Sequence, residues 1–236
     1  MPDDVPLLLI LAGFVCFRTY WVIGAARDQV GLTGSVLKTA STGLLAVVAF
    51  THPTSISPLI GLGLAFGALG DFTLTRRRKT AFLLGMAAFA AGHLAYSAAF
   101  WLRAQTLTDT LPPAALSGLS LAALIVLALL VLSTEIWLAP RTGPLRWPVR
   151  GYVIVIGLMG LTSVLLVPHP ETAGATYLQI GATLFILSDL LLALRLFVVP
   201  TGKTTQKLSI ALWPAYWCGQ MLILHGSGLY WLPFGA

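Results

Sequence analysis

The sequence has very few charged side chains and long stretches that contain none. Only 9% of its 236 residues are charged, against roughly 25% in a soluble globular domain, whereas 57% are hydrophobic and the mean hydropathy is +0.88. A chain of this composition has too little polar surface to face water on all sides, so the composition excludes a soluble domain. The sequence therefore predicts a multi-pass membrane protein.

Residues typical of several kinds of active site are also scarce. The two cysteines, Cys16 and Cys218, lie in apolar stretches, which favours packed thiols over a disulfide, and they lack metal-binding spacing. Of the four histidines, His52 and His169 fall in predicted loops, and there is no HExxH motif. A GxSxG nucleophile elbow and a phosphate-binding P-loop are absent as well. We therefore expect no metal and no organic cofactor.

Apolar stretches long enough to cross a bilayer, which takes roughly 20 residues, occur eight times. The segments between them, such as THPTSISP and VPHPETAG, are short and rich in helix-breaking residues. We therefore predict an all-α bundle of eight transmembrane helices that forms a single integral membrane domain. The predicted spans are 5–25, 35–50, 56–75, 80–101, 114–138, 150–167, 174–199 and 208–231.

Basic residues gather in alternate loops and account for the formal net charge of +6. In a soluble protein this charge would suggest a nucleic-acid partner, but here it indicates topology, and neither nucleic acid nor an obligate protein partner is expected. We expect the odd-numbered loops to be cytoplasmic and both termini to lie on the other side, in the cytoplasmic membrane if the host is bacterial. The odd-loop cations are Arg27, Lys38, Arg76, Arg77, Arg78, Lys79, Arg141, Arg146, Arg150, Lys203 and Lys207, and the even loops hold only Arg103.

Two acidic residues, Asp71 and Asp189, lie well inside predicted spans, both in the cytoplasmic half. A carboxylate that faces hydrocarbon costs several kcal/mol, so an acid in a membrane span has either a partner or a function. A salt bridge to Lys38 or an arginine and a pair of functional carboxyl groups are both open explanations. The other six acids are placed at the terminus, in loops or at a helix end: Asp3, Asp4, Asp28, Asp109, Glu135 and Glu171.

The surroundings of these two aspartates are similar in sequence. Each follows a small residue, Gly70 or Ser188, and precedes a leucine by three positions, Leu74 or Leu192. The two aspartates are also separated by half the length of the chain. With eight helices, this spacing is consistent with a parallel repeat of four helices, in which both aspartate helices cross toward the cytoplasm.

Lys38 enters the second predicted span at the same depth as the aspartates. Ser35, Ser41 and Thr42 recur with it at helical spacing and form a polar stripe. Lys38 is therefore a candidate partner for one carboxylate or for a lipid phosphate. A lysine whose head reaches the interface is the alternative.

Two further pairs of polar side chains share a helix face. His93 and Tyr96 are three positions apart in the fourth predicted span, and Tyr216 and Gln220 are four apart in the eighth. Either pair is suited to line a polar cavity opposite the aspartates. Interhelical hydrogen bonds explain each pair equally well.

Four segments together resemble the YhhN-like family, which includes the mammalian lysoplasmalogenases: LGDFTL with its basic loop, GMAAFAAGHLAYSAAF, GATLFILSDLLLAL and AYWCGQ. The likeness runs from Lys38 to Gln220 and includes the order and spacing of the segments. It implies eight spans, functional carboxyl groups at Asp71 and Asp189, and a functional lysine at Lys38. Thr39 stands here where the family often has proline.

The resemblance also implies a reaction, the hydrolysis of the vinyl ether bond of a 1-alkenyl lysophospholipid to a fatty aldehyde and a glycerophospho-base. Vinyl ethers hydrolyse through protonation of a carbon atom and an oxocarbenium ion that captures water. Two carboxyl groups in a poorly hydrated cavity suit this chemistry, because one can donate a proton while the other stays charged and stabilises the cation. Which aspartate is the acid stays open.

A second class of function fits the same residues. Two intramembrane acids, related halves and a cavity near the midplane also describe a proton-coupled carrier of a small molecule or lipid. A lipid-binding scaffold without catalysis is a third explanation. Aldehyde release by the purified protein distinguishes the hydrolase from both, and dependence on a proton gradient favours the carrier.

Overall fold

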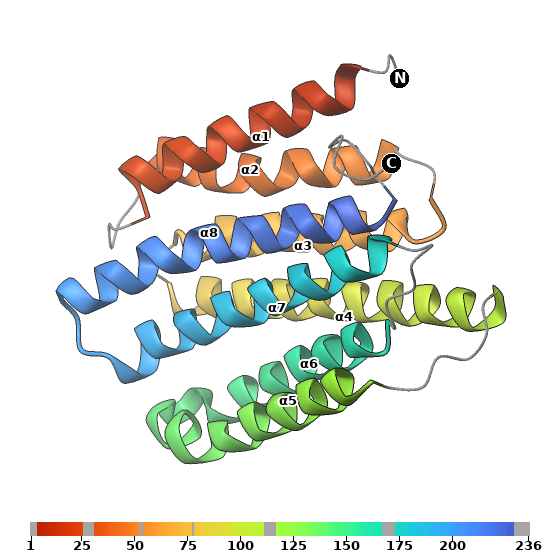
Figure 1. The fold of residues 1–236 in the computed structure, drawn as a ribbon. Coiled ribbons are helices and arrows are strands. Elements are labelled where there is room, and N and C mark those ends of the chain that lie inside the picture. The colour runs from red at the N-terminus through yellow and green to blue at the C-terminus, as the bar shows by residue number, and fades with distance from the viewer. Residues whose placement is uncertain are drawn as a thin grey trace.

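The structure is a computed structural model that describes residues 4–25, 31–51, 54–76, 78–110, 117–166 and 173–228. In these residues it has eight long α-helices and no strand, as Figure 1 shows, which confirms the predicted all-α bundle. Five residues of π-helix, Leu194–Val198, follow directly on α7. The α-helices are α1 (Asp4–Ile23), α2 (Leu32–Thr51), α3 (Ser57–Leu74), α4 (Lys79–Thr110), α5 (Gly118–Trp137), α6 (Arg146–Val164), α7 (Ala173–Ala193) and α8 (Lys203–Gly226).

Seven helices of the described chain, α1 to α7, are long and apolar enough to cross a membrane. The eighth, α8, is 24 residues long, but Lys203 and Lys207 lie in its first turns and Pro214 lies inside it. It is therefore the least apolar of the eight, although it packs lengthwise against α7 in the bundle (Figure 1). The protein is an integral multi-pass membrane protein, and seven of the eight predicted spans meet the requirement for apolar length.

Most helix ends lie within a few residues of the predicted ends, and three differ more. α4 continues past 101 to Thr110, and α8 runs from Lys203 to Gly226 rather than from 208 to 231. The longer α4 places Asp109 in its last turn rather than in a loop, and the terminal Asp4 lies in the first turn of α1. Some predictions fall outside the described residues: the span ends at 114–116, 167 and 229–231, and the positions of Asp3, Arg27, Asp28, His52, Arg77, His169 and Glu171.

Helices that are consecutive in sequence run antiparallel, so the odd-numbered helices all cross in one direction (Figure 1). Consecutive helices pack side by side within α1–α4, and α5–α8 repeat this order. The two halves meet where α4 packs against α6 and where α8 packs against α2. Each half thus places its fourth helix against the second helix of the other half, which is consistent with a repeat of four helices.

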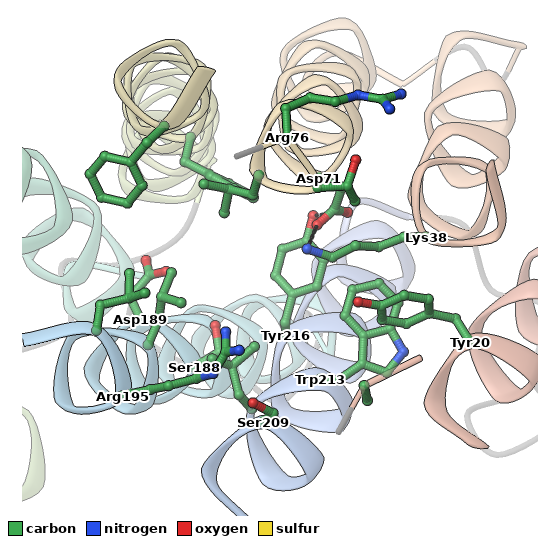
Figure 2. Close-up of a pocket in the computed structure, with 18 residues that line it drawn as sticks. Tyr20, Lys38, Asp71, Arg76, Ser188, Asp189, Arg195, Ser209, Trp213 and Tyr216 are labelled. Carbon is green, nitrogen blue, oxygen red and sulfur yellow. Dashed lines mark hydrogen bonds and ion pairs between the residues drawn. The ribbon is translucent and has the colours of Figure 1, made fainter. Parts of the chain in front are cut away.

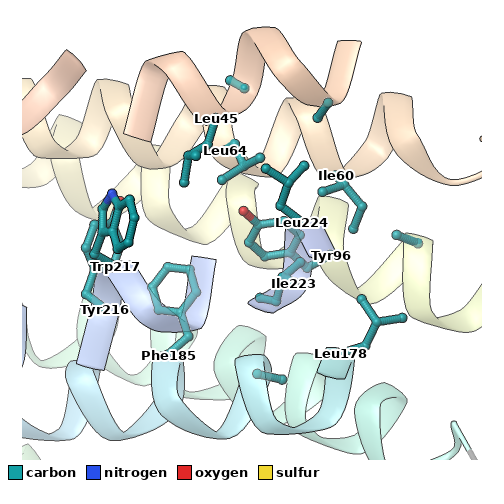
Figure 3. Packing of buried hydrophobic residues seen from close by; sticks show 14 of the residues in the cluster. Leu45, Ile60, Leu64, Tyr96, Leu178, Phe185, Tyr216, Trp217, Ile223 and Leu224 are labelled. Carbon is teal, nitrogen blue, oxygen red and sulfur yellow. The ribbon is translucent and has the colours of Figure 1, made fainter. Parts of the chain in front are cut away.

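The backbones of α7 and α8 approach each other closely at two glycines. A Cβ atom on Gly181 would lie 2.8 Å from the carbonyl oxygen of Gly219, and one on Gly219 would lie 2.9 Å from that of Gly181. Small residues at such contacts are a common means of helix association in lipid, because they let backbones pack directly. Buried hydrophobic residues lie beside this pair, among them Phe185 on α7 and Ile223 on α8 (Figure 3).

Gly181→Ala is expected to lower the free energy of unfolding by about 1–3 kcal/mol, because the added methyl group must push two backbones apart. Gly151→Ala in α6 is the matched control, since a Cβ there meets nothing within 4 Å. Alanine also favours the helix, so the control should be unchanged or slightly more stable. Thermal unfolding in detergent measures both, and equal unfolding temperatures would contradict the close α7–α8 contact.

Candidate functional site

A cavity of about 320 Å³ lies at the end of the bundle where α3 and α7 end (Figure 2). Its walls come from both halves of the chain, and Asp71 of α3 and Asp189 of α7 both line it. The connections at this end are those predicted to be cytoplasmic. The polar and aromatic side chains of the wall are Tyr20, Lys38, Asp71, Thr75, Arg76, Phe82, Phe89, Ser188, Asp189, Arg195, Ser209, Trp213 and Tyr216.

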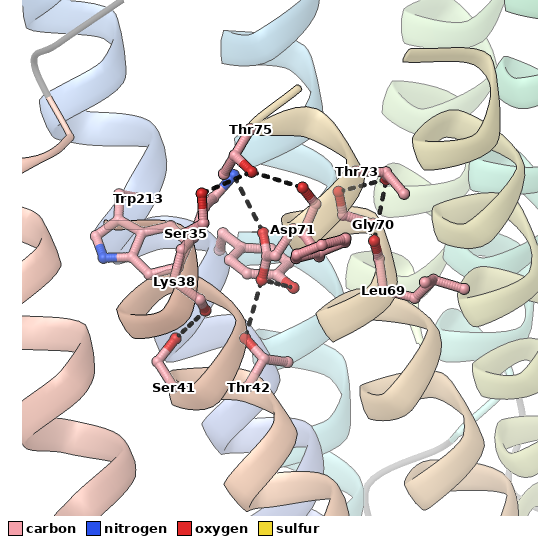
Figure 4. Close-up of polar contacts among 12 residues, drawn as sticks. Ser35, Lys38, Ser41, Thr42, Leu69, Gly70, Asp71, Thr73, Thr75 and Trp213 are labelled. Atoms are coloured by element: carbon pink, nitrogen blue, oxygen red, sulfur yellow. Dashed lines mark hydrogen bonds and ion pairs between the residues drawn. The ribbon is translucent and has the colours of Figure 1, made fainter. Parts of the chain in front are cut away.

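Asp71 is buried, with 1% of its surface exposed, and both carboxylate oxygens have partners (Figure 4). Nζ of Lys38 lies 3.3 Å from Oδ1, and Oδ2 accepts hydrogen bonds from the hydroxyls of Tyr216 (2.9 Å) and Thr42 (3.2 Å). Lys38 and Thr42 are four residues apart on α2 and therefore share a face. The ion pair with Lys38, one of the two explanations left open by the sequence, is thus present.

Asp189 has different partners. Its Oδ2 lies 2.9 Å from Nε2 of His93 and accepts a hydrogen bond of 3.2 Å from the hydroxyl of Tyr152. The other ring nitrogen of His93 lies 3.2 Å from the sulfur of Met159. His93 is fully buried, whereas 9% of the Asp189 side chain is exposed. The carboxyl group of Asp189 therefore faces the cavity with an imidazole behind it.

The two carboxyl sites are assembled in the same way from the two halves. Each aspartate is on the third helix of its half and has a partner on the second helix of that half, Lys38 or Tyr152. Each also has a partner on the fourth helix of the other half, Tyr216 or His93. The chemistry differs, because an ammonium group pairs with one carboxyl group and an imidazole with the other. The two aspartates thus occupy equivalent helix positions and line one cavity, but their carboxyl groups have different partners.

Three of the other predicted site residues line the cavity: Lys38, Ser188 and Tyr216. Ser188 is 2% exposed, and its hydroxyl donates to the carbonyl oxygen of Phe185 at 2.7 Å. Lys38 also lies over the ring of Trp213, with Nζ 5.6 Å from the ring centroid. The cation of Lys38 is therefore held on two sides, by Asp71 and by an aromatic face.

The remaining three predicted residues do not line the cavity. His93 lies behind Asp189, and the hydroxyl of Tyr96 donates to Oε1 of Gln220 in the buried layer between α4 and α8. Tyr96 and Gln220 are each 0% exposed. Tyr96 and Gln220 thus form an interhelical hydrogen bond, which was the alternative to a place in the cavity wall.

Among the residues of the site that the sequence analysis missed, Tyr152 contacts Asp189 without lining the cavity, whereas Arg76 and Arg195 line it. Tyr152 stands two residues inside the sixth predicted span, where its hydroxyl signals a partner. Arg195 lies inside the seventh predicted span, and a cation at that depth marks a polar site. Arg76 was counted only as a topological charge, although it lines the cavity. Two of the three therefore carried a signal, namely a polar group inside an apolar span.

Within the described part of the chain, His, Cys, Asp and Glu side chains form no group of three or more that could hold a metal ion. Cys16 and Cys218 are both free thiols. Cys16 is half-buried, but Cys218 is exposed on the outside of α8, so the prediction of a packed thiol is wrong for Cys218. Neither thiol lines the cavity.

The fold and the site together define a polytopic helical membrane protein with two acids in an intramembrane cavity, an arrangement typical of a functional centre. The chain belongs to the YhhN family, whose sequence profile matches residues 33–227, and this confirms the predicted resemblance. Lysoplasmalogenase TMEM86A of Bos taurus is 34% identical over 181 residues, and that of Homo sapiens is 30% identical over 178 residues. Each match covers 73% of this chain and 65% of the relative's length. No solved structure matches the chain significantly.

Lys38→Met is expected to lower the free energy of unfolding by about 3–5 kcal/mol, because it leaves the buried carboxyl group of Asp71 without its cation. The double variant Lys38→Met/Asp71→Asn should regain most of this loss, since it removes the charge as well. Lys207→Met, at an exposed position of α8, is the control and should change little. Thermal unfolding of the wild type, Lys38→Met, Asp71→Asn, the double variant and the control checks this, and strictly additive effects of Lys38→Met and Asp71→Asn would contradict the ion pair.

Proposed function

We propose that the protein hydrolyses the vinyl ether bond of 1-alkenyl lysophospholipids and releases a fatty aldehyde and a glycerophospho-base. The observation that carries the proposal is that Asp71 and Asp189 line one cavity within the membrane-spanning bundle. Two relatives of this YhhN-family chain are named lysoplasmalogenases, which supports the choice of substrate.

The reaction requires a proton, a negative charge and one water molecule. A general acid protonates the double-bond carbon that is remote from the ether oxygen, and the π electrons form the new C–H bond. The oxocarbenium ion that remains takes up water at the carbon bonded to oxygen and loses a proton, which restores the acid. The resulting hemiacetal breaks its bond between that carbon and the glycerol oxygen, giving the aldehyde and the alcohol. The balance consumes one water and needs no oxidant or reductant.

The different partners of the two aspartates suggest different roles. Asp71 accepts from three donors, so in our proposal it supplies the fixed negative charge that stabilises the oxocarbenium ion. Asp189 contacts His93, which can exchange a proton with it, and we assign the general acid to Asp189. Tyr152 and Tyr216 would hold the two carboxyl groups in place through their hydroxyls.

The phosphate of such a substrate needs positive charge at the mouth of the cavity. Lys38 is engaged with Asp71, so we assign the phosphate to Arg76 and Arg195, which line the cavity beyond the ends of α3 and α7. Arginine is well suited to this role, because its guanidinium group can form two parallel hydrogen bonds with a phosphate. Arg195 belongs to the π-helical segment, a distortion that is frequent at functional sites.

Asp71→Asn and Asp189→Asn should each abolish aldehyde release from an alkenyl lysophospholipid by purified protein, with an expected fall in kcat of about 100-fold or more. Both amides keep the shape of the side chain, so the variants should remain folded. Glu135→Gln is the control, because this acid is exposed and paired with Arg150 away from the cavity. Unchanged activity in either aspartate variant would refute the proposed pair. A folded wild-type protein that releases no aldehyde would favour the carrier.

Arg76→Gln and Arg195→Gln should each raise KM by about 10-fold or more and leave kcat nearly unchanged, because a phosphate contact binds substrate and transition state alike. Arg78→Gln is the matched control, since Arg78 follows in the same connection but does not line the cavity. Steady-state kinetics on the alkenyl lysophospholipid measure the three variants. An equal effect of Arg78→Gln would reduce the role of these arginines to general surface charge.

A further inference from the structure

The Asp189 side chain stands between two spaces that differ in polarity. On one side is the polar cavity, and on the other is a narrow crevice of about 50 Å³ between α5, α6 and α7. Among the described residues, Asp189 alone lines both. The other side chains of the crevice are hydrophobic apart from Thr134, and they include Leu130 on α5, Ile156 on α6 and Ala193 on α7. We call this space the α5–α7 crevice.

The direction of the α5–α7 crevice matches that of a lipid chain in a bilayer. Its wall on α5 runs from Trp137 to Leu127, about 15 Å at 1.5 Å per residue, and its wall on α7 runs from Ala193 to Ile186. Because α5 and α7 end at the same end of the bundle as the polar cavity, the crevice leads from that end toward the middle of the membrane (Figure 1).

The helix on the outer side of this crevice is loosely held. α5 is the most exposed of the seven apolar helices, and only Ser120 and Thr134 are buried on it. As it stands the crevice is too small for a whole hydrocarbon chain, so binding requires an outward shift of α5, which would widen the crevice without opening a packed core. A hydrocarbon chain already in the bilayer gains little from burial alone, so its selection here would depend on fit against these side chains.

We infer that the α5–α7 crevice binds the hydrocarbon chain of the substrate while the headgroup occupies the polar cavity. The inference rests on the proposed function, and it deepens that function by giving the substrate an orientation. The vinyl ether joins the chain to the headgroup, so this orientation places the bond that is cleaved beside Asp189, where the two spaces meet. Asp71, which lines only the polar cavity, then lies on the headgroup side of the bond.

Side chains that narrow the crevice should discriminate against long chains. For Ala193→Phe and Leu130→Phe we expect the ratio of kcat/KM for a long-chain to a very short-chain alkenyl substrate to fall at least tenfold. Leu129→Phe is the matched control, because Leu129 is 62% exposed and does not line the crevice. An unchanged ratio in both crevice variants would overturn the inference. Ala193 is on the same helix as Asp189, whereas Leu130 is on α5. The same change of the ratio at both positions would therefore not be explained by a displacement of Asp189 in one variant.

A second measurement does not depend on hydrolysis. A saturated 1-alkyl lysophospholipid with a photoreactive diazirine on its chain is bound to the wild-type protein and activated, and the labelled peptides are identified by mass spectrometry. We expect labels in residues 127–137 of α5 and 186–193 of α7. The amount of label should be lower in the Leu130→Phe variant. Labels confined to other helices would overturn the inference even if the protein proves to be a hydrolase. Labels in the crevice without aldehyde release would instead refute only the proposed reaction.

Discussion

The carboxylate of Asp71 is the group on which the arrangement of the first half depends. Buried in an apolar bundle, it must receive its hydrogen bonds from other helices, and α2 and α8 supply them. The contact also requires space, and Gly67 provides it. A Cβ atom there would lie 2.9 Å from the hydroxyl of Tyr216 and 2.8 Å from Nε2 of Gln220. A glycine on α3 thus lets α8 come close enough to reach the acid.

In the second half, the same helix positions hold side chains of different chemistry around the aspartate. Asp189 occupies the place of Asp71, but its partner from the opposite half is a histidine and no lysine lies beside it. The different partners place the two carboxyl groups in different environments. In acid catalysis by a carboxyl pair, one group donates a proton and the other stays charged, and such a difference in environment favours this division.

The charged and the apolar side chains of the molecule lie in separate regions, which suits the amphiphilic substrate proposed above. The outside of the bundle is apolar, and exposed large hydrophobic side chains occur on every one of the eight helices. Charged groups inside the bundle are concentrated at one end, where Lys38, Asp71, Arg76, Asp189 and Arg195 surround a single cavity. A molecule with a charged headgroup and an apolar chain can therefore bind with each part in matching surroundings, and only the part between them meets both.

The sequence by itself determined the class of fold, the family and the two aspartates, because length, apolarity and charge placement are local properties of the chain. It also determined most helix ends, since proline, glycine and polar clusters interrupt the spans. The tertiary structure decided which polar groups meet. His93 and Tyr96 share a helix face, yet one contacts Asp189 and the other contacts Gln220 of α8 in the buried layer, where neither Tyr96 nor Gln220 lines the cavity. Helix periodicity gives the face a residue occupies, but only the packing of α4 against α6 and of α8 against α2 determines what lies opposite that face.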